Sequence, residues 1–255
     1  MDANTGAGIN TLFDSQPKRS NGHFKWVDFV KRFWHKDCVA GISLAAFSDA
    51  YRKWCAKSGY RFSLSDAEKF HTAARNAVAT FPKSDSVKLL IAQAVDSLNA
   101  VYDALHILRG EMLRLASLLP EFDVVMEMQG AGDVTGPQLM AEIGDVRRFT
   151  HKGALVAFAG MDAPPFQSGT FDSKSRRISK RGSPHLRKTL FMVASTILQH
   201  SDPANPIFQF MDKKRAEGKH FYVYTVAGAA KFLRIYYARV KTHLAMLDSG
   251  ANSAA

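Results

Sequence analysis

The feature that most constrains the fold of this chain is an apolar stripe in its middle part. Apolar side chains recur there at alternating steps of four and three residues, at Val87, Ile91, Ala94, Leu98, Val101, Leu105, Leu108, Met112 and Leu115. This seven-residue repeat is typical of a helix that packs along one seam. Because no proline interrupts the stretch before Pro120, we expect a single long helix over residues 83–119.

Two kinds of partner are compatible with this seam. The stripe can pack against the rest of its own domain, or it can pair with a second chain as a coiled coil or as a helix hairpin across a dimer. We expect pairing between chains, so the protein is predicted to form a homo-oligomer through residues 83–119. Ala94 permits a close approach of two helices but does not decide how many chains assemble.

The segments on either side of the stripe have helical spacing too, so the predicted fold class is mainly α. Residues 23–82 carry aromatic side chains at steps of three and four and are interpreted as a helical linker region. Residues 120–247 are interpreted as a second helical domain. The glycine-rich and polar ends, residues 1–22 and 248–255, are predicted to be disordered.

Within the second domain, glycine and proline mark the breaks between helices. The glycines of Gly130-Ala131-Gly132 lie between two short helical segments, as in a helix-hairpin-helix turn, although a plain helix turn explains them at least equally well. Prolines and glycines between 163 and 179 predict an irregular loop or short hairpin around Ser168. Ser183-Pro184 combines an N-cap with a proline at the first helical position, which predicts a helix from Pro184.

Composition narrows the class of partner. The 255 residues carry a net charge of +11, which favours nucleic acid over an acidic membrane surface as a partner. No apolar run approaches the roughly 18 residues of a membrane span, so no membrane contact is expected. The two cysteines, Cys38 and Cys55, lack zinc-ligand spacing and fit a reduced intracellular protein without a metal site of its own.

The positive charge is concentrated in one short run. Seven lysines and arginines fall within fifteen residues: Lys174, Arg176, Arg177, Lys180, Arg181, Arg187 and Lys188. No acidic residue lies between Asp172 and Asp202 to neutralise them. A solvated charged face is the alternative, but apolar residues interleave with these cations, and we therefore predict phosphate contacts that do not read base sequence. The aromatic residues of the last helical segment are predicted to build core instead: Phe221, Tyr222, Tyr224, Tyr236 and Tyr237.

Ser168, followed by Gly169, is the candidate nucleophile. A serine hydroxyl needs an activating base or field, and on chemistry alone most loop serines are solvated turn residues. Nearby cations could stabilise negative charge on an attacked phosphodiester. Other serines compete for the role: Ser173, Ser175, Ser179 and Ser183.

Three blocks of the sequence together resemble one family. They are GAGDVTGPQLMAEIGDVRRF (130–149), ALVAFAGMDAPPFQSG (154–169) and RRISKRGSPHLRKTLF (176–191). Their order and spacing are similar to the C-terminal domain of the serine-dependent insertion-sequence transposases that are guided by a bridge RNA. The likeness covers about 120 residues, and the helical region 23–118 is more loosely similar to the family's linker and coiled coil.

The resemblance implies a DNA recombinase that carries out insertion-sequence transposition. Ser168 falls at the family's nucleophilic serine, which forms a phosphoserine link with DNA. The stretch from Lys174 to Lys188 falls in the family's nucleic-acid-contacting region. The implied partners are DNA, a guide RNA and a second copy or full-length transposase, and the implied location is the bacterial cytoplasm, in association with the nucleoid.

The sequence departs from the family at its start. Family members begin with a ribonuclease-H-like (RuvC-like) domain whose acidic quartet holds magnesium, and no such strand-rich segment precedes Phe24. We therefore expect an N-terminally truncated, C-terminal portion that binds no cofactor itself, with magnesium only where the acidic domain is supplied, and that is inactive alone. The alternative is a non-catalytic nucleic-acid-binding or assembly protein that pairs with full-length transposase.

Overall fold

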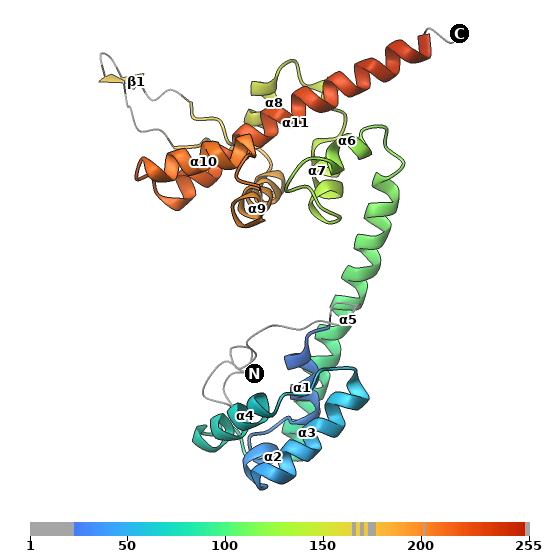
Figure 1. Ribbon diagram of the computed structural model, residues 1–255, viewed down its shortest axis with the longest axis vertical. Coiled ribbons are helices and arrows are strands. Elements are labelled where there is room, and N and C mark those ends of the chain that lie inside the picture. Colours follow the sequence, from blue (N-terminus) through green and yellow to red (C-terminus); the bar gives the residue numbers. More distant parts are fainter. Residues whose placement is uncertain (1–22, 165–166, 169–170, 173–176, 201, 253–255) are drawn as a thin grey trace. The chain divides into compact units, whose positions relative to one another are not determined.

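The computed structural model describes residues 23–164, 167–168, 171–172, 177–200 and 202–252 (Figure 1). The chain divides into two compact units, Met1–Leu108 and Arg109–Ala255. The described residues are mostly helical and include one pair of two-residue strands, which confirms the mainly-α prediction. None of the described helices is both long and apolar enough to cross a membrane.

The first unit is built around an aromatic core. Its helices are α1 (Lys25–Arg32), α2 (Asp37–Ala40), α3 (Leu44–Ser58), α4 (Leu64–Asn76) and the first part of α5 (Asp85–Ala116). Ser43 and Ser63 cap α3 and α4 by accepting hydrogen bonds from the amides of Ala46 and Asp66. Phe29 lies at the centre of the core, where its ring contacts Phe33, Tyr51, Trp54 and Phe70.

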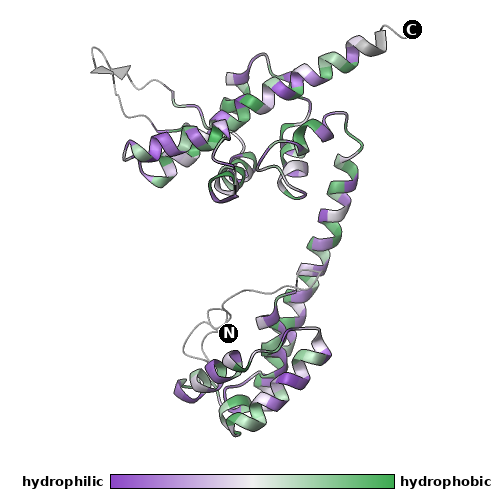
Figure 2. Ribbon diagram, in the orientation of Figure 1, coloured by the Kyte–Doolittle hydropathy of each residue, from purple (hydrophilic) through white to green (hydrophobic). Residues whose placement is uncertain are grey.

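The long helix predicted from the apolar stripe is α5. Ile91 and Leu98 of the stripe pack on the first unit's core beside Val95, which is fully buried, whereas the predicted stripe residue Ala94 is exposed. Farther along, the stripe is exposed: Val101 by 55%, Leu105 by 38%, Leu108 by 60% and Leu115 by 50%. Figure 2 shows apolar residues along the length of this helix. The packing within the chain therefore accounts for only part of the seam.

The second unit is organised around α11 (Phe221–Asn252). Phe232, Leu233 and Tyr236 on this helix are fully buried. Helices α8 (Lys152–Phe158), α9 (Pro184–His200) and α10 (Pro206–Ala216) pack against it. Apolar residues of α9 at Leu186, Leu190, Val193 and Ile197 are also fully buried, as expected for a helix with one apolar face. The remaining short elements are α6 (Phe122–Met126), α7 (Thr135–Ile143) and the 3-10 helix η3 (Val146–Arg148).

The C-terminal end of α11 differs from the sequence-based expectation. The helix continues through Asn252, whereas residues 248–255 were predicted to be disordered. Residues 248–252 are helical, and the Asp248 carboxylate accepts a hydrogen bond from Arg147 Nη1 at 3.1 Å. The polar composition that suggested disorder thus includes an ion-pair partner from a distant part of the sequence.

Close packing against α9 requires a glycine at one position of the turn between α6 and α7. Gly130 has a φ of +90°, and a Cβ there would lie 2.9 Å from side-chain atoms of Val193 and Ile197 on α9. Thr135 closes the turn, because its hydroxyl accepts from the Gly132 amide at 2.9 Å and donates to the Gly130 carbonyl at 3.0 Å. The turn is therefore a packed helix connection held by one threonine.

Gly130→Ala should destabilise the second unit by about 2 to 4 kcal/mol, since it combines a left-handed backbone with overpacking against α9. Gly132→Ala is the matched control two residues away, because nothing lies within 4 Å of its added Cβ and its φ is not positive. Chemical denaturation of both variants checks this, and the control should remain within about 0.5 kcal/mol of the wild type. Equal stability of the two variants would contradict the packing of this turn on α9.

Candidate nucleic-acid interface

Ser168 lies in a short hairpin rather than in a helix. The strands β1 (Gln167–Ser168) and β2 (Phe171–Asp172) pair antiparallel, with Gln167 opposite Asp172 and Ser168 opposite Phe171. Ser168 is thus the last residue of its strand. Gly169, which was expected beside it, lies outside the described residues.

A neck of backbone hydrogen bonds joins the chain entering this segment to the chain leaving it. The Ser179 amide donates to the Asp162 carbonyl at 2.8 Å, and the Lys180 amide donates to the Gly160 carbonyl at 3.0 Å. One step farther in, the Ser183 amide donates to the Phe158 carbonyl at 2.8 Å. These three bonds hold the ends of residues 163–178 together, so the serine segment leaves the helical body at a defined place.

Close backbone contact makes the neck possible. A Cβ on Gly182 would lie 2.0 Å from the Phe158 carbonyl oxygen and 2.4 Å from the Gly160 nitrogen. Only glycine allows two backbones to approach so closely without displacement. Beside this contact, the Ser179 hydroxyl donates to the Asp162 carboxylate. The neck is therefore fixed by both backbone and side-chain bonds.

The neck continues directly into α9. The Ser183 hydroxyl accepts from the Leu186 amide at 3.1 Å, which is the N-cap expected before Pro184. The same hydroxyl donates to the Glu142 carboxylate on α7 at 3.1 Å. Ser183 is thereby engaged in the fold, as is Ser179, so both hydroxyls already have hydrogen-bond partners.

The predicted basic residues separate into three groups. Lys174 and Arg176 lie outside the described residues. Arg177, Lys180, Arg181 and Lys188 are exposed, and none of them forms an ion pair with a carboxylate of the described residues. Arg187 is half-buried and its Nη1 donates to the Ala159 carbonyl at 3.0 Å, so it ties α9 to the neck. Arg187 is thus engaged in the fold, whereas four predicted cations face solvent.

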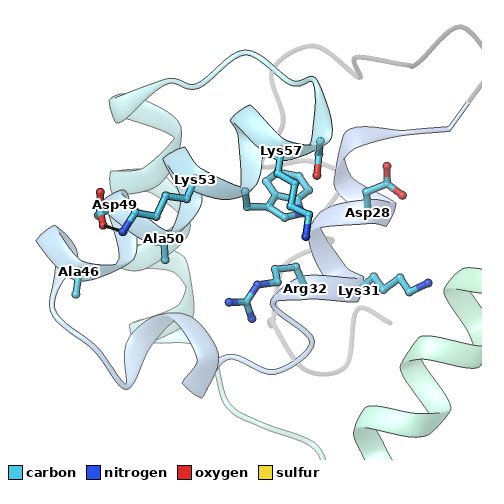
Figure 3. Close-up of a pocket in the computed structure, with 10 residues that line it drawn as sticks. Asp28, Lys31, Arg32, Ala46, Asp49, Ala50, Lys53 and Lys57 are labelled. Atoms are coloured by element: carbon cyan, nitrogen blue, oxygen red, sulfur yellow. Dashed lines mark ion pairs between the residues drawn. The ribbon is translucent and has the colours of Figure 1, made fainter.

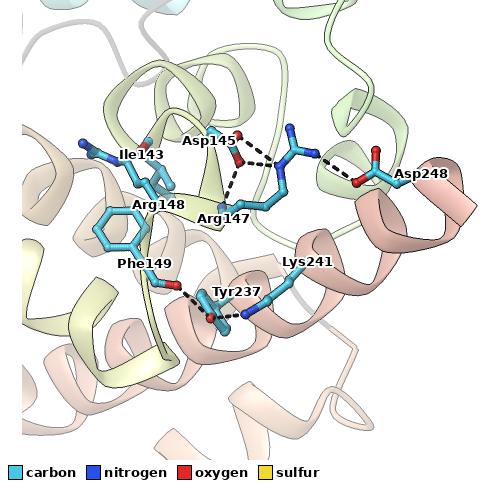
Figure 4. A network of polar contacts seen from close by, with 8 residues as sticks. All are labelled: Ile143, Asp145, Arg147, Arg148, Phe149, Tyr237, Lys241 and Asp248. Atoms are coloured by element: carbon cyan, nitrogen blue, oxygen red, sulfur yellow. Dashed lines mark hydrogen bonds and ion pairs between the residues drawn. The ribbon is translucent and has the colours of Figure 1, made fainter.

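Two further arginines near the neck are occupied by the fold. The Arg148 guanidinium lies 4.6 Å from the centroids of both the Phe149 and Phe158 rings, and its Nε donates to the Ile143 carbonyl. Arg147 bridges Asp145 and Asp248, as Figure 4 shows. Hydrogen bonds from the Arg147 side chain, and then from its amide, hold the pKa of the Asp145 carboxyl below its usual value.

The same network anchors α11 through a buried tyrosine. The Tyr237 hydroxyl donates to the Phe149 carbonyl at 3.0 Å, and Lys241 Nζ donates to the Tyr237 oxygen at 2.9 Å (Figure 4). Tyr236 and Tyr237 are buried, which confirms that these two build core.

Two other aromatic residues predicted to be core are exposed instead. Phe221 is 42% exposed and Tyr222 is 62% exposed. The Tyr222 ring stacks on Phe191 of α9 at 5.9 Å and on His220 at 5.6 Å, and we call these four residues the aromatic patch. Lys188 lies on α9 one turn before Phe191, so a cation adjoins the patch. A signal was present in the sequence, since consecutive apolar residues at a helix start cannot all face one core.

Three amides in and just after the glycine turn already have acceptors within the fold. The Ala131 amide donates to the Met128 carbonyl, and the Gly132 amide donates to Thr135 Oγ1. The Gly136 amide donates to the Gly132 carbonyl. The helix-hairpin-helix interpretation remains a prediction, and the structure explains Gly130 by its packing on α9.

The described residues do not fit a magnesium site. No group of three or more potential metal ligands gathers anywhere in the part of the chain that the structure describes. The two carboxylates that contact the neck are engaged, Asp162 by Ser179 and Glu142 by Ser183, and Asp145 is engaged by Arg147.

A protein-family model matches part of the second unit. Residues 123–209 match the model of the Transposase IS116/IS110/IS902 family. The match covers α6 to the start of α10 and includes Ser168, the neck and the exposed cations. This part of the chain is thus similar to transposases of insertion sequences, which confirms that part of the resemblance.

Two curated relatives come from insertion elements. The "Insertion element IS116 uncharacterized 44.8 kDa protein" of Streptomyces clavuligerus is 24% identical over 165 residues, which are 65% of this chain and 40% of that protein. The "Insertion element IS900 uncharacterized 42 kDa protein" of Mycobacterium paratuberculosis is 25% identical over 122 residues, 48% of this chain and 30% of that protein. The chain therefore spans two fifths or less of the length of these relatives.

The Asp145–Arg147 contact generates a pH prediction. Because the pKa of Asp145 is lowered in the fold, its contribution to stability is present above the unfolded pKa of about 3.9 and is lost as pH falls through the folded pKa. In a carboxyl-carbon NMR titration, Asp145 should titrate below its usual range, and Arg147→Ala should raise its pKa. Arg239→Ala, which removes a cation paired with Glu127, is the control and should leave Asp145 unchanged.

Proposed function

We propose that this chain is the DNA-recombining part of an insertion-sequence transposase, in which Ser168 attacks a DNA phosphodiester. The observation that carries the proposal is the neck. It presents the Ser168 hairpin on a closed stem whose returning side carries Arg177, Lys180 and Arg181 without ion-pair partners among the described residues. The match of residues 123–209 to an insertion-sequence transposase family supports the same reaction class.

The chemistry assigned to Ser168 is a phosphoryl transfer. The serine oxygen forms a bond to phosphorus, the bond from phosphorus to one DNA oxygen breaks, and the serine proton is transferred to water or to the departing DNA hydroxyl. The product is a phosphoserine diester that a second DNA hydroxyl can attack. Negative charge grows on the phosphoryl oxygens during each step, and cations positioned beside them lower that barrier.

Magnesium, where the reaction uses it, is proposed to come with an acidic ribonuclease-H-like domain, since the described residues of this chain do not fit a metal site. The residues of this chain bind and orient the nucleic acid and supply the nucleophile. DNA and a guide RNA are the proposed partners.

Replacing Arg177, Lys180 and Arg181 together by Gln should weaken binding to duplex DNA and flatten its salt dependence. Each neutralised phosphate contributes roughly −0.9 to the slope of log K against log salt, so the slope should shrink by about 2 to 3. Fluorescence anisotropy at several salt concentrations measures this. Gln at Lys213, Lys214 and Arg215 on α10 removes the same charge elsewhere in the unit and is the control. Equal slopes for both triple variants would exclude the neck cations as phosphate contacts.

Ser168→Ala should abolish formation of a covalent protein–DNA adduct while leaving DNA affinity unchanged, because one hydroxyl is a minor phosphate contact. The reaction contains this chain, DNA, magnesium, a separately made acidic ribonuclease-H-like domain and its guide RNA, and the adduct is detected on a denaturing gel. This chain with DNA and magnesium alone should form none.

Ser173→Ala is the matched control for Ser168→Ala and should keep the adduct. An adduct that persists in Ser168→Ala would show that another residue is the nucleophile. Binding without any adduct under all conditions would favour the second candidate function, a non-catalytic nucleic-acid-binding or assembly protein, which the engaged carboxylates Asp145 and Asp162 make chemically reasonable.

We also propose that the exposed part of the α5 stripe pairs with a second chain. Asp at both Leu105 and Leu108 should convert an oligomer into a monomer, because unpaired charge in a buried seam is costly. Asp at Leu90 and Ile107, each 69% exposed and off the stripe, is the matched control and should leave assembly intact. Sedimentation measures the oligomeric state of both variants. A wild type that is monomeric at high micromolar concentration would exclude pairing through this stripe.

A further inference from the structure

A hollow lies on the first unit between α1 and α3, outside every region discussed so far. It has a volume of about 940 Å³, far more than a single bound ion needs. Its lining is rich in cations and is shown in Figure 3. The lining residues are Asp28, Lys31, Arg32, Ala46, Asp49, Ala50, Lys53, Trp54, Lys57 and Ser58.

The acidic groups around this hollow are already engaged. Asp49 pairs with Lys53 at 2.8 Å, and Asp96 pairs with Lys31. The Asp28 carboxylate accepts from the Tyr60 hydroxyl at 2.7 Å and from the Asn99 amide at 3.2 Å, which turns it toward the core.

Two cations remain without an acidic partner. Arg32 and Lys57 are both exposed, and neither is within ion-pair distance of a carboxylate in the described residues. Figure 3 shows Lys57 extending from α3 toward α1, Arg32 extending from α1 along the hollow, and Lys31 pointing away from both. Cations that line one hollow without a free carboxylate repel each other, so an anion bound in the hollow stabilises them.

A simpler explanation covers each cation singly. Arg32 lies in the last turn of α1 and Lys57 in the last turn of α3, where a positive charge interacts favourably with the helix dipole. The helix dipole does not explain why both cations line the same hollow. Arg75, in the last turn of α4 and outside the hollow, has the same relation to its own helix and supplies a control.

We propose that this hollow binds the phosphodiester backbone of nucleic acid, with Arg32 and Lys57 as the phosphate contacts. The protein then has two phosphate-contacting surfaces, one in each unit, and the choice of nucleic acid over other anions rests on the proposed function above. The hollow does not read bases by stacking on Trp54, because the Tyr51 and Tyr60 rings already lie nearly parallel to the indole at 5.7 and 5.4 Å. Binding at the hollow is therefore independent of sequence.

The test compares salt slopes for a DNA duplex and an RNA hairpin of matched length. Arg32→Gln with Lys57→Gln should reduce the slope by about 2 for either probe, since each phosphate contributes roughly 0.9. The control, Arg75→Gln with Lys88→Gln, removes two exposed cations of the same unit outside the hollow and should keep the wild-type slope. A slope reduced for only one probe would assign the hollow to that nucleic acid.

Two further variants make the outcomes decisive. Arg32→Lys with Lys57→Arg keeps both charges and should keep the slope, and thermal unfolding of all variants should match that of the control. A slope that stays at the wild-type value in the Gln variant, or a wild type that binds neither probe, would overturn the proposal.

The variant with Gln at Arg177, Lys180 and Arg181 separates the two surfaces. If only the neck variant flattens the salt slope, the hollow is excluded as a phosphate-contacting surface. If only the hollow variant flattens it, the neck is excluded.

Discussion

The candidate site depends on the close approach of two backbones at the neck. Gly182 lies directly against the Phe158 carbonyl, and three amide–carbonyl bonds hold the chain entering the Ser168 segment beside the chain leaving it. The Phe158 end is fixed because α8 packs on α11, and the Ser183 end is fixed because that serine caps α9. The position of the hairpin is thus inherited from the buried core of the second unit.

The distribution of arginines follows from the same geometry. Arg148 and Arg187 direct their guanidinium groups to backbone carbonyls, and Arg147 bridges two carboxylates, so these three stabilise the body of the unit. Arg177 and Arg181, next to the neck, face solvent. Charge alone does not distinguish the two groups, since Arg187 belongs to the same basic run as Arg177 and Arg181 and is nevertheless engaged by the fold. Their different surroundings separate structural cations from candidate phosphate contacts.

Each unit has an apolar core of its own, and each carries one of the two surfaces that we propose to contact phosphates. The first unit combines an aromatic core centred on Phe29 with a cation-lined hollow, and the second combines the α11 core with the serine hairpin. The long helix α5 contributes residues to both units and exposes half of its apolar stripe.

Local pattern determined much of the secondary structure. The apolar repeat gave α5, and Ser183-Pro184 gave the start of α9, because helical periodicity and capping depend on residues within one or two turns. Tertiary structure alone decided that Gly182 meets Phe158 and that Arg187, unlike Arg177 and Arg181, is half-buried. These outcomes depend on which distant segments pack together, and a periodicity within one helix carries no information about its neighbours.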